Sequence, residues 1–181
     1  MARRVVLHIG LPKTGTTFLQ TTMWHNRPLL RQQGVLYPGR HRLNHYNAFQ
    51  EVRRGDSGGA WSALVSELAG WPEVGLVSHE FFSMCSTAQV ERVVADLSPA
   101  EVDLVVTVRS YVRQFPAVWQ EALKMGGSAS FDEFMDDAFA GRLRGAWGWA
   151  SQDVPRVLER WACGVPTGRI HVVTVPPPGA P

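Results

Sequence analysis

The sequence of 181 residues lacks long hydrophobic runs, runs of lysine and arginine, and all but two cysteines. Cys85 and Cys163 lie far apart without metal-site spacing, which indicates a reduced, cytoplasmic setting. The formal net charge of +2 argues against nucleic acid as a partner, although local basic clusters can still bind a small anionic ligand. The apolar run near the N-terminus is broken by His8 and is too short for a signal peptide or a membrane span. We therefore expect a soluble cytoplasmic protein.

Short runs rich in valine, leucine and isoleucine alternate with segments of helical spacing. The runs lack polar alternation, which is typical of parallel strands buried on both faces. The expected strands are 4–9, 74–78, 102–108 and 169–175, with a less regular fifth at 34–37. The expected helices are 16–32, 59–69, 87–97, 114–125 and 153–163. This alternation predicts an α/β fold of three layers, with a parallel sheet of about five strands.

The chain length suits one domain, and we assign residues 1–181 to it. The Pro- and Gly-rich tail at 176–181 directly follows a strand, where an α/β fold usually adds a closing helix. A chain shortened at its C-terminus explains this arrangement, and a naturally short protein with a frayed end is the alternative.

A glycine-containing loop, His8-Ile9-Gly10-Leu11-Pro12-Lys13-Thr14-Gly15-Thr16-Thr17, joins the first expected strand to the first expected helix. Backbone N–H groups and a helix N-terminus in that setting form an anion site. Gly10 and Gly15 have the spacing of a nucleotide P-loop, so the fold is expected to be P-loop NTPase-like. Glycine- and threonine-rich turns that bind nothing are the alternative.

The lysine of this loop is displaced from its place in a nucleoside triphosphatase. Thr16 follows the second glycine, whereas the cation stands inside the loop at Lys13. The triphosphatase lysine reaches the β- and γ-phosphates, and the hydroxyl after it holds Mg²⁺. A cation three residues earlier favours a shorter anionic group, such as one phosphate carrying a sulfonate, bound without a metal.

The segment Pro12–Gln20, PKTGTTFLQ, resembles the 5′-phosphosulfate loop of the sulfotransferase superfamily. The chain as a whole resembles a bacterial member of that superfamily. The resemblance implies a donor, 3′-phosphoadenosine 5′-phosphosulfate (PAPS), with 3′,5′-bisphosphoadenosine as product and no metal. It implies that Lys13 also stabilises charge on the leaving group. The residues implied to bind the 5′-phosphosulfate are Pro12, Lys13, Thr14, Gly15, Thr16 and Thr17.

A second family element is an arginine that closes a later strand and contacts the 3′-phosphate. Arg109 stands in that place, directly after an apolar run. The family usually has a serine eight residues later, but position 117 is alanine here. Ser110 and Arg113 are the candidates to replace that contact. An ordinary strand-end salt bridge is the alternative for Arg109.

A third family element is the catalytic base after an intermediate strand. Many members have Lys-Thr-His there, and others use a glutamate. The sequence reads Val77-Ser78-His79-Glu80-Phe81, so His79 matches the histidine and Glu80 is its competitor, while Val77 replaces the lysine. Either side chain can accept a hydroxyl proton. The resemblance favours His79.

Three further segments are candidates for an acceptor site or a metal site. His41, Arg42 and His45 lie in a polar segment that reads as an exposed loop, with His45 as another possible base. Trp147 and Trp149 are expected by default to pack in the core, although their loop-like segment can instead wall an apolar or sugar acceptor. The acidic cluster at 132–137 fits a solvated helix face better than a metal site. The family's C-terminal Gly- and Lys-rich loop is absent from the sequence.

These features together predict transfer of a sulfonate from PAPS to a hydroxyl or amine of a small-molecule or carbohydrate acceptor. A P-loop kinase is the first alternative, although position 16 lacks its lysine and the strand before Arg109 ends without an acid for Mg²⁺. A non-catalytic nucleotide-binding module is the second, because of Ala117 and the absent C-terminal loop. Neither the acceptor nor the oligomeric state follows from the sequence.

Overall fold

The computed structural model describes residues 1–177 and contains a five-stranded sheet of order β2-β3-β1-β4-β5. All four neighbouring pairs run parallel. The predicted α/β fold with about five parallel strands is thereby confirmed. The strands are β1 (Arg4–His8), β2 (Val35–Leu36), β3 (Val74–Ser78), β4 (Glu101–Val108) and β5 (Ile170–Thr174).

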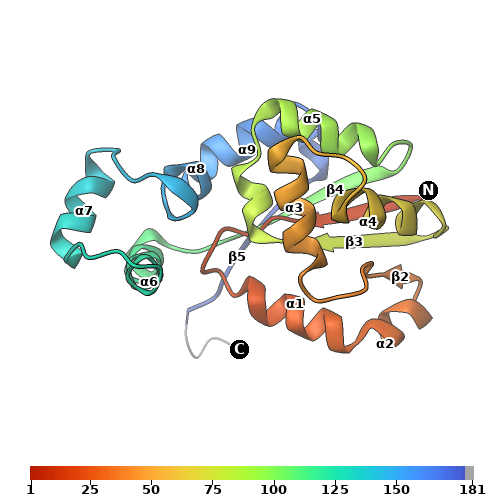
Figure 1. Cartoon of the computed structure of the whole chain (residues 1–181), viewed down its shortest axis with the longest axis horizontal. Helices are drawn as coiled ribbons and strands as arrows, with labels where there is room; N and C mark the ends of the chain where they lie inside the picture. The colour runs from red at the N-terminus through yellow and green to blue at the C-terminus, as the bar shows by residue number, and fades with distance from the viewer. Residues whose placement is uncertain (178–181) are drawn as a thin grey trace.

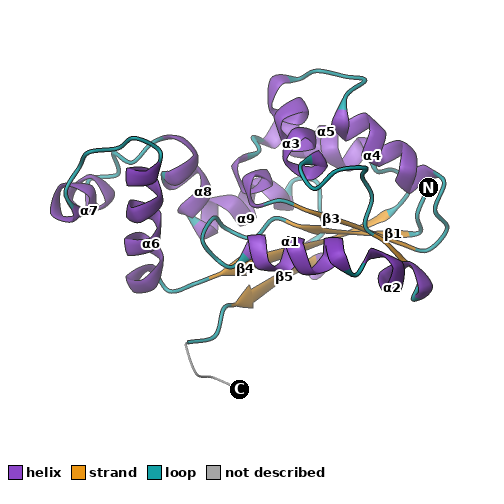
Figure 2. Cartoon of the chain, turned by 60° about the horizontal axis from the view of Figure 1, so that its bottom comes forward, coloured by secondary structure: helices purple, strands orange, loops and turns teal. Residues whose placement is uncertain are grey.

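Helices cover both faces of the sheet, which gives the expected three layers. Helices α1 and α2 lie on one face, and α3, α4, α5 and α9 lie on the other (Figures 1 and 2). The segment with α6, α7 and α8 extends beyond the carboxyl ends of the strands (Figure 1). The helices are α1 (Thr16–His25), α2 (Arg27–Gln32), α3 (Asn44–Arg54), α4 (Ala60–Ala69), α5 (Thr87–Asp96), α6 (Tyr111–Lys124), α7 (Phe131–Phe139), α8 (Trp149–Gln152) and α9 (Val154–Ala162), with 3₁₀ turns at Glu80–Met84, Gly145–Trp147 and Thr167–Arg169.

The central strands are buried as their composition predicts. Val5, Leu7, Leu104 and Val106 have no exposed surface, and each contributes roughly 1.5–3 kcal/mol by leaving water. Strand β5 differs, because it stands at the edge of the sheet and its side chains from His171 to Thr174 are exposed. The expectation of burial on both faces is therefore wrong for β5. Residues 178–181 of the predicted tail lie outside the described part of the chain.

Two helical segments differ from the prediction. The helix expected at 16–32 is two helices, because the chain turns at Asn26 and α2 begins with a proline in its first turn. The segment 39–49, expected as an exposed loop, instead enters helix α3. Ala48, Phe49 and Val52 of α3 are buried in the core. Their helical spacing was the overlooked signal.

The hydrophobic core has two parts. The larger one packs against the sheet and includes the fully buried Trp61, Trp161 and Phe82. The smaller one, built on Phe115 and Phe134, joins α6 to α7 and also contacts Trp119 and Trp149. The second core holds the α6–α8 segment beside the end of the sheet where the glycine loop lies.

Candidate functional site

The glycine loop crosses the carboxyl end of the sheet between β1 and α1. Gly15 has φ 88° and Lys13 has φ 71°, so the backbone is left-handed at both positions. A Cβ at Gly10 would lie 1.8 Å from Thr107 Oγ1, so only glycine lets the loop pass β4 at this distance. These turns leave α1 with its N-terminus at the loop, and its first N–H groups lack intrahelical partners. The loop therefore has the geometry of an anion cradle.

A buried polar network lies beneath the loop and connects three strands. His8 contacts Ser78 Oγ through Nδ1 at 2.8 Å and Thr107 Oγ1 through Nε2 at 3.2 Å. Thr14 Oγ1 lies 2.8 Å from Thr107 Oγ1 and donates to the Leu11 carbonyl at 2.7 Å. Burial lowers the pKa of His8 to about 4, so the imidazole is neutral near neutral pH. The Thr14 hydroxyl is thus used inside the protein, and only its backbone faces the cradle.

Two glutamines hold the loop from the other side. Gln114 of α6 donates from Nε2 to the Pro12 carbonyl and, at 2.8 Å, to Gln152 Oε1 of α8. Both glutamines are fully buried, and Tyr111 Oη donates to the Gln152 carbonyl at 2.9 Å. Pro12 therefore takes part in the scaffold of the loop. No motif in the sequence predicted this pair, since its members lie far apart along the chain.

A cavity of about 230 Å³ opens above the loop. Lys13 points into it, and its Nζ lies 2.9 Å from Glu121 Oε2 of α6. The hydrogen bond from Lys13 is the main cause that lowers the pKa of the Glu121 carboxyl. Glu121 was not predicted, because nothing in its helix marks it as different from a solvated glutamate. The cavity is lined by Lys13, Gly15, Thr16, Thr17, Glu80, Glu121 and Trp147.

The two candidate bases are close neighbours, with His79 Nδ1 3.9 Å from Glu80 Oε2, but their further contacts differ. Glu80 lines the loop cavity, and its Oε2 accepts a hydrogen bond from Gln20 Nε2 of α1 at 2.9 Å. His79 is buried and accepts from the Phe81 N–H through Nδ1 at 3.2 Å. Its ring stacks on Phe49 with centroids 6.5 Å apart. Burial lowers the pKa of His79. This geometry favours Glu80 over His79 for contact with a molecule in the cavity.

Arg109 lies at the end of β4 and connects the loop with a second cavity of about 670 Å³. Its Nη1 donates to the Lys13 carbonyl at 3.1 Å, while Nε is buried and makes no hydrogen bond within residues 1–177. Burial, followed by the charge of Arg113, lowers the pKa of the Arg109 guanidinium. Ser110 and Arg113 line the same cavity. A cation with an unsatisfied buried N–H beside the loop suits an anionic group of a ligand.

Of the other positions predicted to line an acceptor site, some line the loop cavity and others are buried in the protein. His45 is not on an exposed loop but buried in α3, where Nε2 contacts the Pro38 carbonyl at 2.9 Å and Nδ1 accepts from the Ser78 N–H at 3.2 Å. Burial lowers its pKa to about 4. Both ring nitrogens are therefore occupied in the scaffold. Trp147 lines the loop cavity, but Trp149 packs into the second core and donates to the Ala138 carbonyl at 3.1 Å.

The acidic cluster at 132–137 lies on helix α7. Within residues 1–177 no group of three His, Cys, Asp or Glu side chains is arranged to hold a metal ion, Asp132, Asp136 and Asp137 included. In the same part of the chain, no helix is long and apolar enough to cross a membrane.

Comparisons with known proteins bear on the fold. No protein-family model matches the chain, and no curated protein matches its sequence. A sulfotransferase from Alicyclobacillus acidocaldarius has a similar structure, with a TM-score of 0.60 and 14% identity over 97% of this chain and 74% of that chain. A gluconokinase from Sinorhizobium meliloti 1021 is aligned over 97% of this chain and 85% of its own, with a TM-score of 0.42 and 13% identity. The chain thus has the P-loop α/β fold that its resemblance to the sulfotransferase superfamily implied.

Proposed function

We propose that the protein is a PAPS-dependent sulfotransferase that transfers a sulfonate to a hydroxyl or amine acceptor. The observation that carries this proposal is the cavity above the loop, where the Lys13 ammonium and the Glu80 carboxylate lie beside the start of α1. Such a cavity holds the two kinds of group that the transfer needs. One is a cation for the leaving group, and the other is a base for the acceptor proton.

The residues around the loop fit the donor. The left-handed backbone at Lys13 and Gly15 and the first N–H groups of α1 suit the 5′-phosphosulfate. Thr16 and Thr17 add their N–H groups at the start of the helix. Arg109, with its unsatisfied Nε, suits the 3′-phosphate, and Ser110 and Arg113 of the same cavity suit the adjacent part of the donor. The donor supplies the sulfonate and a bisphosphate leaving group.

The chemistry of the chain's own residues follows from this arrangement. Glu80, held by Gln20, takes the proton of the acceptor hydroxyl as the new O–S bond forms. The bridging S–O bond breaks, and its electron pair remains on the phosphate oxygen. Lys13 stabilises that developing negative charge, together with the loop amides. Trp147 lines the same cavity and adds an apolar surface beside these groups.

Lys13 must change partner during the reaction. In the structure without ligands it forms an ion pair with Glu121. An anionic donor in the loop draws the ammonium away from Glu121, because the loop then presents several negative oxygens instead of one carboxylate. Glu121 therefore holds Lys13 in place before the donor binds.

Calorimetry with two nucleotides tests the proposal. We expect 3′,5′-bisphosphoadenosine to bind without a metal, and more tightly than ATP with Mg²⁺. Tighter binding of ATP with Mg²⁺ would favour a P-loop kinase. Bisphosphate binding without any turnover of PAPS, across a panel of hydroxyl and amine acceptors, would favour a non-catalytic binding module.

A further inference from the structure

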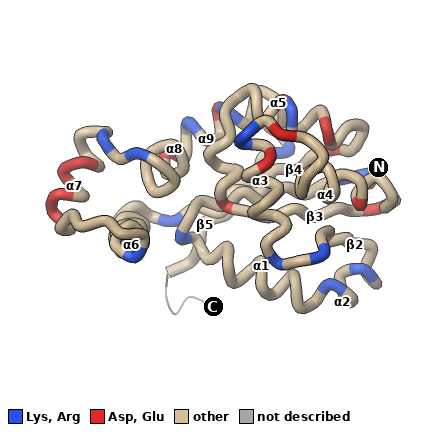
Figure 3. Tube along the Cα trace, viewed as in Figure 1, with Lys and Arg blue, Asp and Glu red and all other residues tan. Residues whose placement is uncertain are grey.

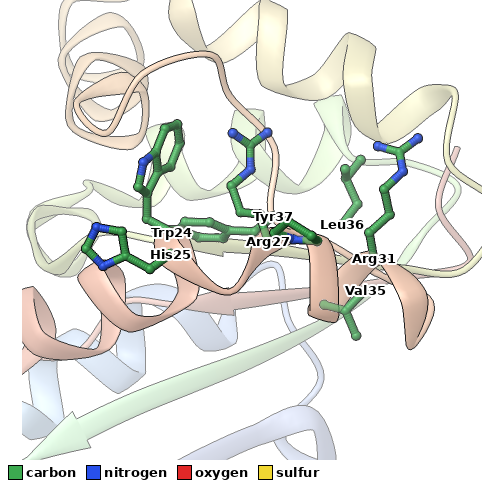
Figure 4. A pocket seen from close by; sticks show the side chains of 8 residues that line it. Trp24, His25, Arg27, Arg31, Val35, Leu36 and Tyr37 are labelled. Carbon is green, nitrogen blue, oxygen red and sulfur yellow. The ribbon is translucent and has the colours of Figure 1, made fainter.

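A third cavity, of about 570 Å³, lies between α1, α2 and β2. Two aromatic rings, Trp24 and Tyr37, and the guanidinium groups of Arg27 and Arg31 line it, together with His25. Figure 4 shows Trp24, Arg27 and Arg31 rising from the helices toward the same side. The Arg27 guanidinium carbon lies over the Trp24 ring, 4.5 Å from its centroid, which is a cation–π contact. The cavity thus combines aromatic walls with positive charge.

The segment that builds this cavity carries positive charge of its own, and the acidic groups beside it come from later segments: Glu67 accepts from the Gly39 N–H, and the Glu73 carboxylate lies against Gly34. The first 50 residues contain seven Lys and Arg residues and no Asp or Glu. In Figure 3, blue segments lie on α2 and on the loop that leads to α3, whereas α1 carries neither blue nor red. Within residues 1–177, Arg27, Arg31 and Arg42 form no salt bridge, whereas Arg4, Arg54, Arg92, Arg142, Arg156 and Arg169 each form one or more. Unpaired guanidinium groups around a cavity attract an anionic ligand.

One face of α1 connects this cavity with the loop cavity. Thr17 lines the loop cavity, Gln20 bonds Glu80, and Trp24 lines the third cavity. Residues three or four apart share a helix face, so these side chains form one row. Thr17 and Trp24 are seven residues apart, which is about 10 Å along the helix axis. Thr21, in the same row, accepts a hydrogen bond from Arg42 Nη2 at 2.8 Å.

Charged side chains near both ends of this row affect the pKa of Tyr37, which lines the third cavity. Burial is the main cause that raises the pKa of Tyr37 above its ordinary value. Arg27 and Arg42 oppose that change, and Glu80 adds to it. Tyr37 therefore lies within electrostatic reach of both the arginines and the candidate base. The two cavities belong to one surface along α1.

We propose that this third cavity holds an anionic group of the acceptor. The acceptor is then a hydroxyl-bearing molecule with a carboxylate, sulfate or phosphate about 10 Å from the hydroxyl that receives the sulfonate. Arg27 and Arg31 bind the anionic group, and Trp24 and Tyr37 contact the body of the molecule. This inference rests on the proposed function, because it places the reacting hydroxyl at Glu80.

A matched pair of disaccharides tests the charge of the acceptor. Cellobiuronic acid and cellobiose share a skeleton and differ in one carboxylate. With 3′,5′-bisphosphoadenosine present at saturation, calorimetry is expected to give about tenfold tighter binding for cellobiuronic acid, and the difference is expected to shrink as salt is added. Equal affinity for the two sugars, or measurable binding of neither, would overturn the proposal.

Variants locate the binding to the third cavity. Arg27→Gln and Arg31→Gln are expected to remove most of the preference for the carboxylate, and Arg27→Lys to keep part of it. The matched control is Arg53→Gln, because Arg53 is exposed on α3 and, among residues 1–177, its side chain hydrogen-bonds Gln50 and forms no salt bridge. A preference that survives both cavity substitutions would overturn the proposal. Failure of the proposed function is distinguishable, since it shows as loss of bisphosphate binding in the unmodified protein.

Discussion

The two sides of the glycine loop differ in how their polar groups are held. Beneath the loop, His8, Thr14 and Thr107 are buried and bonded to one another. Above it, Lys13 and Glu121 are partly exposed and paired with each other, and a ligand can replace Glu121 as the partner of Lys13. A buried network with satisfied partners fixes a backbone, whereas a partly exposed ion pair is exchanged at small cost. The loop therefore has a rigid buried support on one side, and on the other side groups that face the cavity and can change partner.

The largest expected effect comes from removing the base above the loop. Glu80→Gln keeps the size and the contact with Gln20 but cannot accept a proton, so we expect turnover to fall by roughly 10²–10⁴-fold with bisphosphate affinity nearly unchanged. Steady-state kinetics together with calorimetry measure the two quantities.

His79→Phe is the matched comparison for that variant. The phenyl ring keeps the packing against Phe49 and removes both ring nitrogens, so near-normal turnover is expected if Glu80 is the base. An inactive His79→Phe protein beside an active Glu80→Gln protein would assign the base to His79, as the sequence pattern favoured.

The second effect concerns the cation at the end of β4. Arg109→Ala is expected to weaken 3′,5′-bisphosphoadenosine binding by about 1.5–3 kcal/mol, the usual loss for a hydrogen bond to a charged group. Adenosine 5′-phosphate lacks the 3′-phosphate and is expected to lose less. Some loss for both ligands follows from the bond between Arg109 and the Lys13 carbonyl.

Two further variants control this measurement. Arg109→Lys retains the charge and is expected to recover part of the bisphosphate affinity. Arg144→Ala removes an exposed arginine that bonds only nearby carbonyl groups, and it is expected to change nothing. Equal losses for the two nucleotides in Arg109→Ala would mean that Arg109 only supports the loop.

The sequence predicted the features of this region that depend on local patterns, but not those that depend on contacts between distant residues. The strands and the loop were predictable, because continuous Val/Leu/Ile runs and the spacing of Gly10 and Gly15 are local patterns. The network beneath the loop was not, since His8 meets Ser78 and Thr107 only after the strands pair. Likewise, the sequence placed His79 and Glu80 together at a strand end. Only the folded structure shows that Glu80 lines the loop cavity while the His79 ring stacks on Phe49.

The third effect is the loss of folding stability at acid pH that the buried histidines beneath the loop cause. The pKa values of His8 and His45 are lowered from 6.5 to about 4, so the unfolded chain binds protons more readily than the folded one. Stability is therefore full above the unfolded pKa and falls as the pH decreases toward the folded value. Each histidine is expected to remove about 2 kcal/mol of unfolding free energy between about pH 7 and about pH 5.

Urea unfolding at several pH values measures this loss. His45→Gln removes one titrating group, so the unfolding free energy of the variant is expected to depend less steeply on pH than that of the parent protein, whatever its stability at neutral pH. An unchanged slope would show that the buried imidazole does not account for the acid sensitivity.

The smallest effect comes from the exchangeable ion pair above the loop. Glu121→Gln removes the carboxylate that competes for Lys13, so bisphosphate binding is expected to tighten by a few-fold, in the range of a partly exposed ion pair. Added salt is expected to reduce that gain, because it screens the competing charge in the parent protein. Lys124→Gln is the control. Lys124 also contacts Glu121, at 3.4 Å, but its substitution leaves the ion pair between Lys13 and Glu121 in place. Weaker bisphosphate binding in Glu121→Gln would instead mean that Glu121 positions Lys13 for the donor rather than competing with it.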